Sequence, residues 1–366
     1  MSDQLLKGFA EQIQGAVQAK QLLRITGSGS KDWLGGELKG TPLSTKDYQG
    51  VVSYQPDELV ITVKAGTLIK EVESILAEKN QQFSFESPHF GANATIGGMV
   101  CSGLAGPGRV SAGNLRDFVL GAKVMDGQSQ IMNFGGTVMK NVAGYDVSRL
   151  MPGSFGTLGL LLDVSIKVLP KPAASATVTT QITQAEAIQL MNLLASQPWP
   201  LSASCWQGDG SGTLHLRLNG AKAAVESAIQ TFGQKYGMKV IDDEQAAIFW
   251  HDLKEQKNTW FSESSESPLW RFAVAPTSAP LDLPGTTLIE WHGGQRWWKG
   301  QIDAESAKKI ALAANGHASI FRASHKNQAM LSSLKDNPLT SPLATIQDRL
   351  AKAFDPNGVF ATGRLA

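Results

Sequence analysis

The stretch GGTVMKNVAGYDVSRLMPGSFGTLGLLLDVSIKVLPKP, residues 135–172, joins a glycine-rich segment to a strongly patterned strand. From Leu160 to Val168 every second residue is apolar, which predicts a half-buried β-strand. Four glycines precede this strand, at positions 144, 153, 156 and 159. Glycine tolerates positive φ and has no Cβ atom, so backbone N–H groups in this segment can approach a bound group closely. The stretch therefore predicts a ligand-binding segment that is anchored to a sheet.

The length and composition of the chain limit the classes of protein to which it can belong. A length of 366 residues predicts two domains rather than one. The 33 Lys and Arg residues nearly balance the 32 Asp and Glu residues, which argues against a nucleic-acid partner. The first twenty residues lack the apolar core of a signal peptide, and no apolar run is long enough to span a bilayer, so we expect a cytoplasmic protein. The two cysteines, Cys101 and Cys205, form neither a disulfide framework nor a metal-binding spacing.

Periodicity predicts the elements of the first half. A helix is expected over residues 3–20, strands over 22–26, 51–55 and 59–66, and a helix over 68–76. The Asp126-Gly127 pair predicts a hairpin within residues 118–136.

The segment LPKPAASA, residues 169–176, predicts a domain boundary near residue 171. After it, residues 176–241 read as β-α-β-β-α-β, the order of a ferredoxin-like unit. A weaker second series of strands and one helix follows between residues 269 and 324. We therefore expect domains at 1–171 and 172–340, followed by a C-terminal helix and tail, 341–366, that return towards the first domain.

Three glycine-rich loops, each beside a strand, suit a ligand that carries phosphates, because successive backbone N–H groups in such turns bind anions. Ordinary turns explain any one loop equally well, but all three together favour a ligand. The loops are not a Walker A motif, which needs Gly-Lys followed by Ser or Thr. They are not a dinucleotide fingerprint either, since Asp32 stands where a third glycine is needed after Gly27 and Gly29.

Three segments carry a resemblance to a known family: LLRITGSGSKDWLGG (22–36), ATIGGMVCSGLAGPGR (94–109) and KNVAGYDVSRLMPGSFGTLGLLLDVSIKVLPKP (140–172). They resemble the pyrophosphate loop, the second FAD loop and the closing segment of the vanillyl-alcohol-oxidase type flavoproteins. The resemblance implies an α+β fold, in which a PCMH-type FAD-binding domain of two α/β subdomains is followed by a ferredoxin-like α+β cap domain. Within the family, the sequence is most similar to the FAD-binding subunits of bacterial glycolate oxidases.

By position, the resemblance implies three sets of FAD-binding residues. The first loop contributes Gly27, Ser28, Gly29, Ser30 and Lys31. The second contributes Thr95, Ile96, Gly97, Gly98, Gly103, Gly106 and Arg109. The closing segment contributes Gly144, Tyr145, Asp146, Gly153, Ser154, Gly156, Thr157, Gly159 and Leu160. Lys140 and Asn141 are candidates for polar contacts to the isoalloxazine, and a surface turn explains them equally well.

The sequence also departs from the family. Relatives with covalent flavin attach it through a loop histidine, and GSGSKDW has none, so we expect non-covalent FAD. The His-rich metal segment of catalytic 2-hydroxy-acid dehydrogenases is missing, and no two of the six histidines have the spacing of a helical metal site. No metal site is therefore expected. The ending FDPNGVFATGR has Ala361 and Thr362 where the family has Asn-Pro, so a substrate contact from this tail is in doubt.

The resemblance implies an FAD-binding subunit of a multi-subunit enzyme that oxidises a 2-hydroxy acid, glycolate to glyoxylate, with D-lactate as a second candidate substrate. Its partners would be a sister FAD-binding catalytic subunit and an iron–sulfur subunit, since two cysteines cannot hold a four-cysteine cluster. Membrane contact would come only through these partners. The alternatives are a stand-alone flavin oxidoreductase with another substrate, or a non-catalytic electron-relay or structural subunit.

Two expectations concern the cap. If the chain acts on substrate itself, the candidate residues are Arg271, His292, Arg296, Lys299 and Arg322. The aromatic and cationic run WHGGQRWWKG, residues 291–300, is a candidate partner surface, because Trp and Arg contribute much of the energy of protein interfaces.

Overall fold

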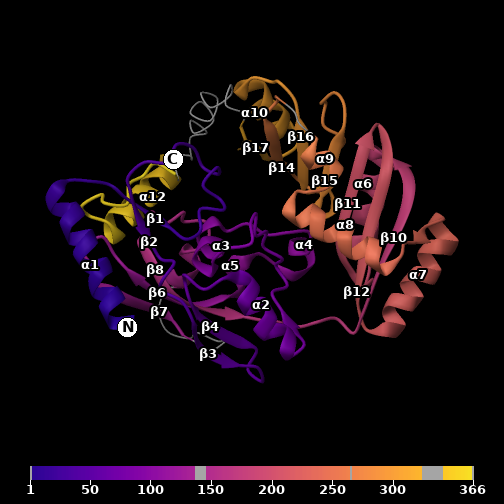
Figure 1. Cartoon of the computed structure of the whole chain (residues 1–366). Helices are drawn as coiled ribbons and strands as arrows, with labels where there is room; N and C mark the ends of the chain where they lie inside the picture. The colour runs from indigo at the N-terminus through magenta and orange to yellow at the C-terminus, as the bar shows by residue number, and fades with distance from the viewer. Residues whose placement is uncertain (1, 137–145, 264–265, 324–340, 365–366) are drawn as a thin grey trace. The chain divides into compact units, whose positions relative to one another are not determined.

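The computed structural model describes residues 2–136, 146–263, 266–323 and 341–364. The chain forms two compact units (Figure 1). The first comprises Met1–Ala105, Asn114–Pro170 and Asp336–Ala366, and the second comprises Gly106–Gly113 and Lys171–Lys335. The change of unit at residues 170 and 171 falls in the proline-containing segment. The segment Gly106–Gly113, which the expected boundaries assign to the first domain, groups instead with the second unit.

The described elements of the first unit are α1 (Ser2–Ala19), β1 (Leu23–Thr26), β2 (Thr41–Ser44), β3 (Val51–Gln55), β4 (Val60–Lys64), α2 (Ile69–Glu78), β5 (Gln81–Gln82), α3 (Ile96–Ser102), α5 (Leu115–Phe118), β6 (Val119–Met125), β7 (Ile131–Gly135), η1 (Val147–Leu150), β8 (Leu160–Lys167), β9 (Leu169–Pro170) and α12 (Ser341–Phe354). Strands β1 and β2 pair in parallel, and β5 pairs with β9. The predicted hairpin is present as β6 and β7.

The main sheet of this unit has the order β3-β4-β8-β6-β7, and every neighbouring pair is antiparallel. The alternating strand predicted from Leu160 is β8, at the centre of this sheet. It was expected to be half-buried, but its two faces are both largely covered: Leu161 is 2% exposed and Ser165 is 8% exposed. A central strand has a hydrogen-bonded neighbour on each side, so its polar residues lose solvent as well as its apolar ones.

A core in the first unit joins distant parts of the chain. Phe9 and Ile13 of α1 pack in one cluster with Leu160 of β8 and with Phe360 near the C-terminal end. Phe360 is fully buried, and the N–H of Leu23 donates a 2.8 Å hydrogen bond to the carbonyl of Val359. The C-terminal segment is therefore part of the core of this unit.

The described elements of the second unit are α4 (Arg109–Ala112), β10 (Ala174–Thr183), α6 (Gln184–Ala195), β11 (Leu201–Asp209), β12 (Ser211–Gly220), α7 (Lys222–Tyr236), β13 (Lys239–Val240), α8 (Asp243–Glu255), α9 (Thr259–Ser262), β14 (Leu269–Ala273), β15 (Thr287–Glu290), η2 (Trp291–Gly293), β16 (Gln295–Lys299), α10 (Ala304–Ala313) and β17 (His317–Arg322).

The sheet of the second unit is built from two ferredoxin-like halves. Its order is β13-β10-β12-β11-β15-β16-β14-β17. The first half contains β10 to β13 and the second contains β14 to β17. If the strands of each half are numbered 1 to 4 along the chain, both halves have the order 4-1-3-2 from the outer edge of the sheet inwards. The two halves join through the antiparallel pair β11 and β15. The first half confirms the predicted β-α-β-β-α-β unit. The weaker series is its structural repeat, in which residues 274–286 connect β14 to β15 without a helix.

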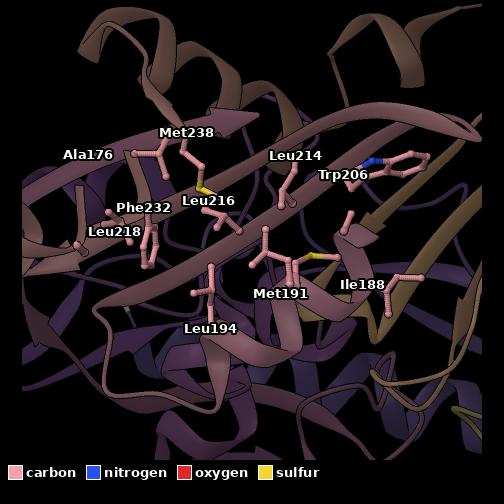
Figure 2. Close-up of a cluster of buried hydrophobic side chains, with 14 of the residues drawn as sticks. Ala176, Ile188, Met191, Leu194, Trp206, Leu214, Leu216, Leu218, Phe232 and Met238 are labelled. Atoms are coloured by element: carbon pink, nitrogen blue, oxygen red, sulfur yellow. The ribbon is translucent and has the colours of Figure 1, made fainter. Parts of the chain in front are cut away.

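Helices α6 and α7 cover one face of the first half (Figure 2). Met191 and Leu194 of α6 and Phe232 of α7 pack against Trp206 of β11 and Leu216 of β12, and all five side chains are fully buried. The indole N–H of Trp206 has a hydrogen-bond partner inside this core, because Nε1 donates to the carbonyl of Ile182 at 3.2 Å. The second unit therefore has a hydrophobic core of its own between these helices and its sheet.

The run WHGGQRWWKG is not an exposed surface within this unit. Trp291, Trp297 and Trp298 are each at most 7% exposed, and Arg296 is 2% exposed. The reason is the position of β16 between β15 and β14, inside the sheet rather than at its edge. The prediction of a partner surface on this run is wrong.

Candidate functional site

A cavity in the first unit opens where β1 ends and the first glycine-rich loop begins. The residues predicted for FAD that line it are Gly27, Ser28, Gly29, Ser30, Lys31, Thr95, Gly97, Gly98 and Gly156. Members of all three predicted loops thus meet at one cavity, although they lie far apart in the sequence. The lining residues that sequence reasoning missed are Ile25, Thr26, Asp32, Thr45, Ala65, Cys101, Ser102, Phe155, Leu161 and Arg364.

The loop after β1 keeps its shape through short-range contacts. The carbonyl of Thr26 accepts hydrogen bonds from the N–H of Thr45 at 2.9 Å and from its hydroxyl at 3.3 Å, so the pairing of β1 with β2 extends to the start of the loop. Gly29 has a φ of +77°, which favours glycine. Within the described part of the chain, the N–H groups of Ser28 and Gly29 donate no hydrogen bond. These two groups are available to a ligand.

The first and second loops approach each other closely, and glycine permits this. A Cβ atom on Gly27 would collide with the hydroxyl of Thr95, and one on Gly97 would lie 2.8 Å from the Cβ of Ala65. The Thr95 hydroxyl caps helix α3 by accepting from the N–H of Gly98 at 3.2 Å. A side chain at either glycine would separate the two walls of the cavity.

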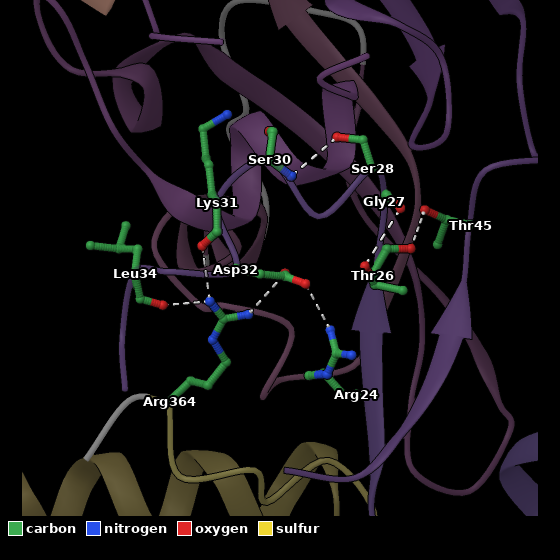
Figure 3. A network of polar contacts seen from close by, with 10 residues as sticks. All are labelled: Arg24, Thr26, Gly27, Ser28, Ser30, Lys31, Asp32, Leu34, Thr45 and Arg364. Atoms are coloured by element: carbon green, nitrogen blue, oxygen red, sulfur yellow. Dashed lines mark hydrogen bonds and ion pairs between the residues drawn. The ribbon is translucent and has the colours of Figure 1, made fainter. Parts of the chain in front are cut away.

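Asp32 and two arginines form a cluster of charged side chains at the cavity (Figure 3). Lys31, Asp32 and Arg364 line it. Asp32 pairs with Arg24 at 3.2 Å and lies 3.9 Å from Arg364. Two guanidinium groups therefore share one carboxylate, while the ammonium of Lys31 points away from this cluster and donates to the carbonyl of His89. A surplus of positive charge with available backbone donors fits the pyrophosphate of a dinucleotide.

His89 does not line this cavity, although it contacts the first loop. Its Nε2 lies 3.2 Å from Oε1 of Glu73, and its carbonyl accepts from Nζ of Lys31 at 3.0 Å. It therefore acts here through its backbone, by holding the lysine of the first loop.

Several other predicted FAD residues lie outside the cavity lining. They are Ile96, Gly103, Asp146, Gly153, Ser154, Thr157, Gly159 and Leu160. Ile96 is the first residue of α3 and its side chain is fully buried, and Gly103 caps the C-terminal end of that helix with a φ of +63°. The carboxylate of Asp146 pairs with Arg149 at 2.9 Å and accepts from the hydroxyl of Ser148. Lys140, Asn141, Gly144 and Tyr145 lie outside the described residues.

Gly106 and Arg109 group with the second unit rather than with the cavity. The carbonyl of Gly106 accepts from Nε1 of Trp291 at 3.1 Å. The guanidinium carbon of Arg109 lies 4.5 Å from the centre of the Trp291 ring, and that of Arg271 lies 5.4 Å from it. Two arginines therefore contact one indole within the second unit.

Most of the candidate catalytic residues in the cap make structural contacts. Arg296 donates to three backbone carbonyls, those of Gly293, Ala279 and Ser278, at 3.1, 2.5 and 2.5 Å. Nζ of Lys299 donates to the carbonyls of residues 260, 261 and 263 at 2.6, 3.2 and 2.8 Å. Arg322 donates to Oε1 of Gln256 at 3.0 Å. These side chains stabilise loops of the second unit.

His292 is buried and neutral near pH 7, because burial lowers its pKa to about 4. The hydroxyl of Ser204 accepts from the backbone N–H of His292 at 2.9 Å and lies 2.9 Å from its Nδ1. The Ser204 hydroxyl therefore hydrogen-bonds both to the backbone and to the ring of His292. Nδ1 of this histidine therefore already has a hydrogen-bond partner.

Arg271 differs from the other cap candidates. Its Nε donates to Oε1 of Gln295 at 2.8 Å, and Nε2 of Gln295 donates to the buried carboxylate of Glu290 at 3.2 Å. Burial, and then the charge of Arg109, lower the pKa of Arg271 to about 10. It remains a cation near pH 7 that is held in a fixed orientation.

Two further findings concern the described residues. They include no group of three or more His, Cys, Asp or Glu side chains that could hold a metal ion. They also include no helix of the length and hydropathy that crossing a bilayer requires.

These features define an FAD-binding flavoprotein: three loops meet at a positively charged cavity in one unit, and the other unit is ferredoxin-like. The family described as "FAD binding domain" matches residues 9–147. The chain is 40% identical over 360 residues to the glycolate oxidase subunit GlcE of Escherichia coli, covering 98% of this chain and 97% of that protein. The chain belongs to the GlcE family of FAD-dependent oxidoreductase subunits.

More distant similarities agree with this family. The glycolate oxidase subunit GlcD of Bacillus subtilis is 31% identical over 138 residues, which cover 38% of this chain and 29% of that protein. A structure of alkyldihydroxyacetonephosphate synthase superposes with a TM-score of 0.63, covering 96% of this chain and 74% of that one. Its sequence identity is 12%, so this match concerns the fold alone.

Proposed function

We propose that this chain is the FAD-binding subunit of a multi-subunit enzyme that oxidises glycolate to glyoxylate. The relatives that support this are named as subunits of glycolate oxidase. When bound, FAD would supply the redox chemistry of this enzyme, either by accepting a hydride from the carbon that carries the substrate hydroxyl or by passing electrons on. D-lactate is the second candidate substrate, since relatives of lower coverage are D-lactate dehydrogenases.

In this proposal the residues of the chain hold FAD without a covalent bond. The N–H groups of Ser28 and Gly29 would donate to the pyrophosphate, and Lys31 would supply positive charge at the same cavity. No histidine occurs among the described residues that line the cavity. The cysteine there, Cys101, is a poor nucleophile, because burial raises the pKa of its thiol to about 11. Acid precipitation should release all the flavin into the supernatant, and a yellow pellet would contradict this part.

The chain relays electrons rather than removing the hydride itself. The observation that carries this is the set of contacts made by the cap candidates. Arg296 and Lys299 each donate to backbone carbonyls, and His292 is buried with its Nδ1 already hydrogen-bonded to Ser204. A general base must have a free acceptor within reach of the proton that it takes. We therefore assign substrate oxidation to a sister FAD-binding subunit and electron acceptance to an iron–sulfur subunit.

The test is anaerobic mixing of the isolated, FAD-loaded chain with glycolate and, separately, with D-lactate. The flavin absorbance should stay unchanged over minutes, and it should bleach when the partner subunits are added. Bleaching of the isolated chain within seconds would overturn the relay role and leave the FAD assignment intact.

The alternative is a flavin oxidoreductase that oxidises its substrate without partner subunits. The contacts of Arg109 and Arg271 with the Trp291 ring favour it. Two cations on one aromatic ring would suit a carboxylate ligand. If the isolated chain is bleached, Arg271→Gln should raise the KM for the 2-hydroxy acid more than it changes kcat. A purely structural subunit without FAD is the remaining alternative, and a colourless reconstituted chain would support it.

A further inference from the structure

We propose that Arg364 is a positioning residue for FAD: the C-terminal segment reaches back and fixes the turn that follows the first glycine-rich loop. The inference rests on the FAD site proposed above and goes beyond it, because this residue belongs to none of the three predicted loops. It acts through the backbone of residues 31–34 and through Asp32.

The contacts of Arg364 bridge more than three hundred residues of sequence (Figure 3). One terminal nitrogen donates to the carbonyls of Lys31 at 3.2 Å and Leu34 at 2.5 Å. The other lies 3.9 Å from the carboxylate of Asp32. The guanidinium carbon lies 5.5 Å from the centre of the Phe155 ring. One side chain thus joins the first loop to the closing segment.

Arg364 can hold these contacts because the chain before it is anchored. Phe360 is fully buried and Val359 is 2% exposed, both in the core that contains α1 and β8. The carboxylate of Asp355 accepts from the N–H groups of Val359 at 3.0 Å and Phe360 at 2.6 Å, which closes the turn before them. Arg364 follows this anchor by four residues, so its backbone has little freedom to withdraw.

The charges around Arg364 indicate that an anion completes the cluster. The side chains of Arg24 and Arg364 are 13% and 7% exposed and share the carboxylate of Asp32. The Nε atoms of both arginines are buried and have no hydrogen-bond partner among the described residues. Lys31 adds another cation at the cavity. Burying cations with one shared carboxylate is unfavourable, and an anion that carries two charges, such as a pyrophosphate, offsets this.

The position of the turn determines where the loop donors point. Lys31 is the last residue of the predicted pyrophosphate loop, and its carbonyl is one of the two that Arg364 holds. Without the guanidinium, the turn over residues 31–34 would lose three of its restraints at once. The N–H groups of Ser28 and Gly29 would then bind FAD only after an ordering step, which lowers affinity.

The test measures the Kd of the apo chain for FAD by quenching of flavin fluorescence. Arg364→Gln should weaken FAD binding roughly tenfold or more, as expected for loss of two charge-assisted hydrogen bonds that hold the turn. Arg364→Lys, which keeps the charge and loses the planar fork, should give an intermediate loss. The matched control is Lys352→Gln on α12, an exposed side chain in the same segment with the same change of charge.

Two further readouts separate positioning from general destabilisation. ADP contains the pyrophosphate and lacks the flavin, so its Kd should rise by the same factor as that of FAD. Asp32→Asn and Arg364→Gln together should weaken binding by less than the product of the single effects, since both act on one turn. Wild-type FAD affinity in Arg364→Gln and Arg364→Lys would overturn the proposal, and so would an unchanged Kd for ADP or strict additivity. If Arg364→Gln does not fold, Arg364→Lys decides. Failure of the wild-type chain to bind FAD would instead contradict the proposed FAD site.

Discussion

At the scale of single residues, the glycines of the cavity differ from glycines that only shape turns. Gly156 lines the cavity and has a φ of +78°, and a Cβ there would lie 3.3 Å from Ile25. Gly210 forms the turn between β11 and β12 with a φ of +66° and has open space around it. A substitution at either position would therefore strain the backbone, but only Gly156 lies at the cavity.

Gly156→Val should abolish flavin content, and Gly210→Val should leave it near one FAD per chain. Both substitutions place a branched residue at positive φ, which costs on the order of 1–2 kcal/mol. Only the first also places a side chain in the cavity. The measurement is the ratio of flavin to protein absorbance after reconstitution. Equal flavin loss in both variants would contradict the assignment of Gly156 to the FAD site.

His292 provides a prediction about pH. Its pKa is about 4 in the folded chain and near 6.5 in the unfolded chain, so unfolding takes up a proton between these values. The contribution of neutral His292 to stability is full above pH 6.5 and is lost as the pH falls towards 4. Between pH 7 and pH 5 this loss is about 2 kcal/mol.

His292→Asn should therefore make the free energy of unfolding of the second unit less dependent on pH. Asn tolerates the φ of 56° found at this position, and its amide can donate to or accept from Ser204 without titrating. Urea unfolding at pH 7 and pH 5 measures the difference, with His251→Asn as a control at an exposed side chain. The same pH dependence in wild type and His292→Asn would show that burial does not hold this histidine neutral.

At the scale of elements, periodicity predicted what local sequence determines. The strand from Leu160 and the hairpin at Asp126 and Gly127 depend on alternation and on a turn pair, and both are present. The short strand β2, Thr41–Ser44, was missed because it has no alternating pattern and is defined only by its parallel pairing with β1. Helix α8, Asp243–Glu255, was missed as well, although Asp242 caps it by accepting from the N–H groups of residues 244 and 245.

Strand β16 shows why composition misled the prediction for residues 291–300. Trp and Arg are common at interfaces, but they are also tolerated in a core when their polar atoms have partners. Nε1 of Trp297 donates to the carboxylate of Glu290 at 2.6 Å, and Nε1 of Trp298 donates to the carbonyl of Pro284 at 2.8 Å. The pairing of these partners is long-range in the fold and cannot be read from the run itself.

Arg296→Met should destabilise the second unit by about 3 kcal/mol, because three carbonyls lose their donor in a buried place. Lys309→Met on the exposed side of α10 removes the same charge and should change stability by less than about 0.5 kcal/mol. Urea unfolding monitored by tryptophan fluorescence measures both variants. If Arg296→Met is as stable as Lys309→Met, the role assigned to these hydrogen bonds is wrong.

At the scale of the whole molecule, the candidate site was only partly predictable from sequence. The glycine loops can be found because each is local. Arg364 could not be found in this way, since its partners are 330 and 333 positions away along the chain. Gly106 and Arg109 were assigned to FAD by resemblance, and they group with the second unit because Trp291 is their partner. Sequence thus located loops that line the cavity but not the residues that hold the loops in place.

We propose that the two compact units are the two domains, each with its own core, and that FAD binds only the first. Tryptophan fluorescence follows mainly the second unit, because eight of the nine tryptophans lie there and only Trp33 lies in the first. Flavin fluorescence, excited in the visible where tryptophan does not absorb, reports release of FAD from the first unit. The two signals can therefore follow the two units separately in one heating experiment.

On heating, flavin release and the change in tryptophan fluorescence should occur as two transitions with different dependence on FAD. A ligand that binds only the folded state at a hundred times its Kd stabilises it by about 2.7 kcal/mol. For a unit of this size, that should raise the midpoint of flavin release by roughly 5–10 °C. The tryptophan midpoint should move little, because the residues that line the cavity all belong to the first unit.

Arg364→Gln should reduce the shift in the midpoint of flavin release at the same FAD concentration, since the Kd of this variant for FAD is expected to be higher. If excess FAD raises both midpoints equally, the two units unfold as one, and the assignment of FAD stabilisation to the first unit alone is wrong.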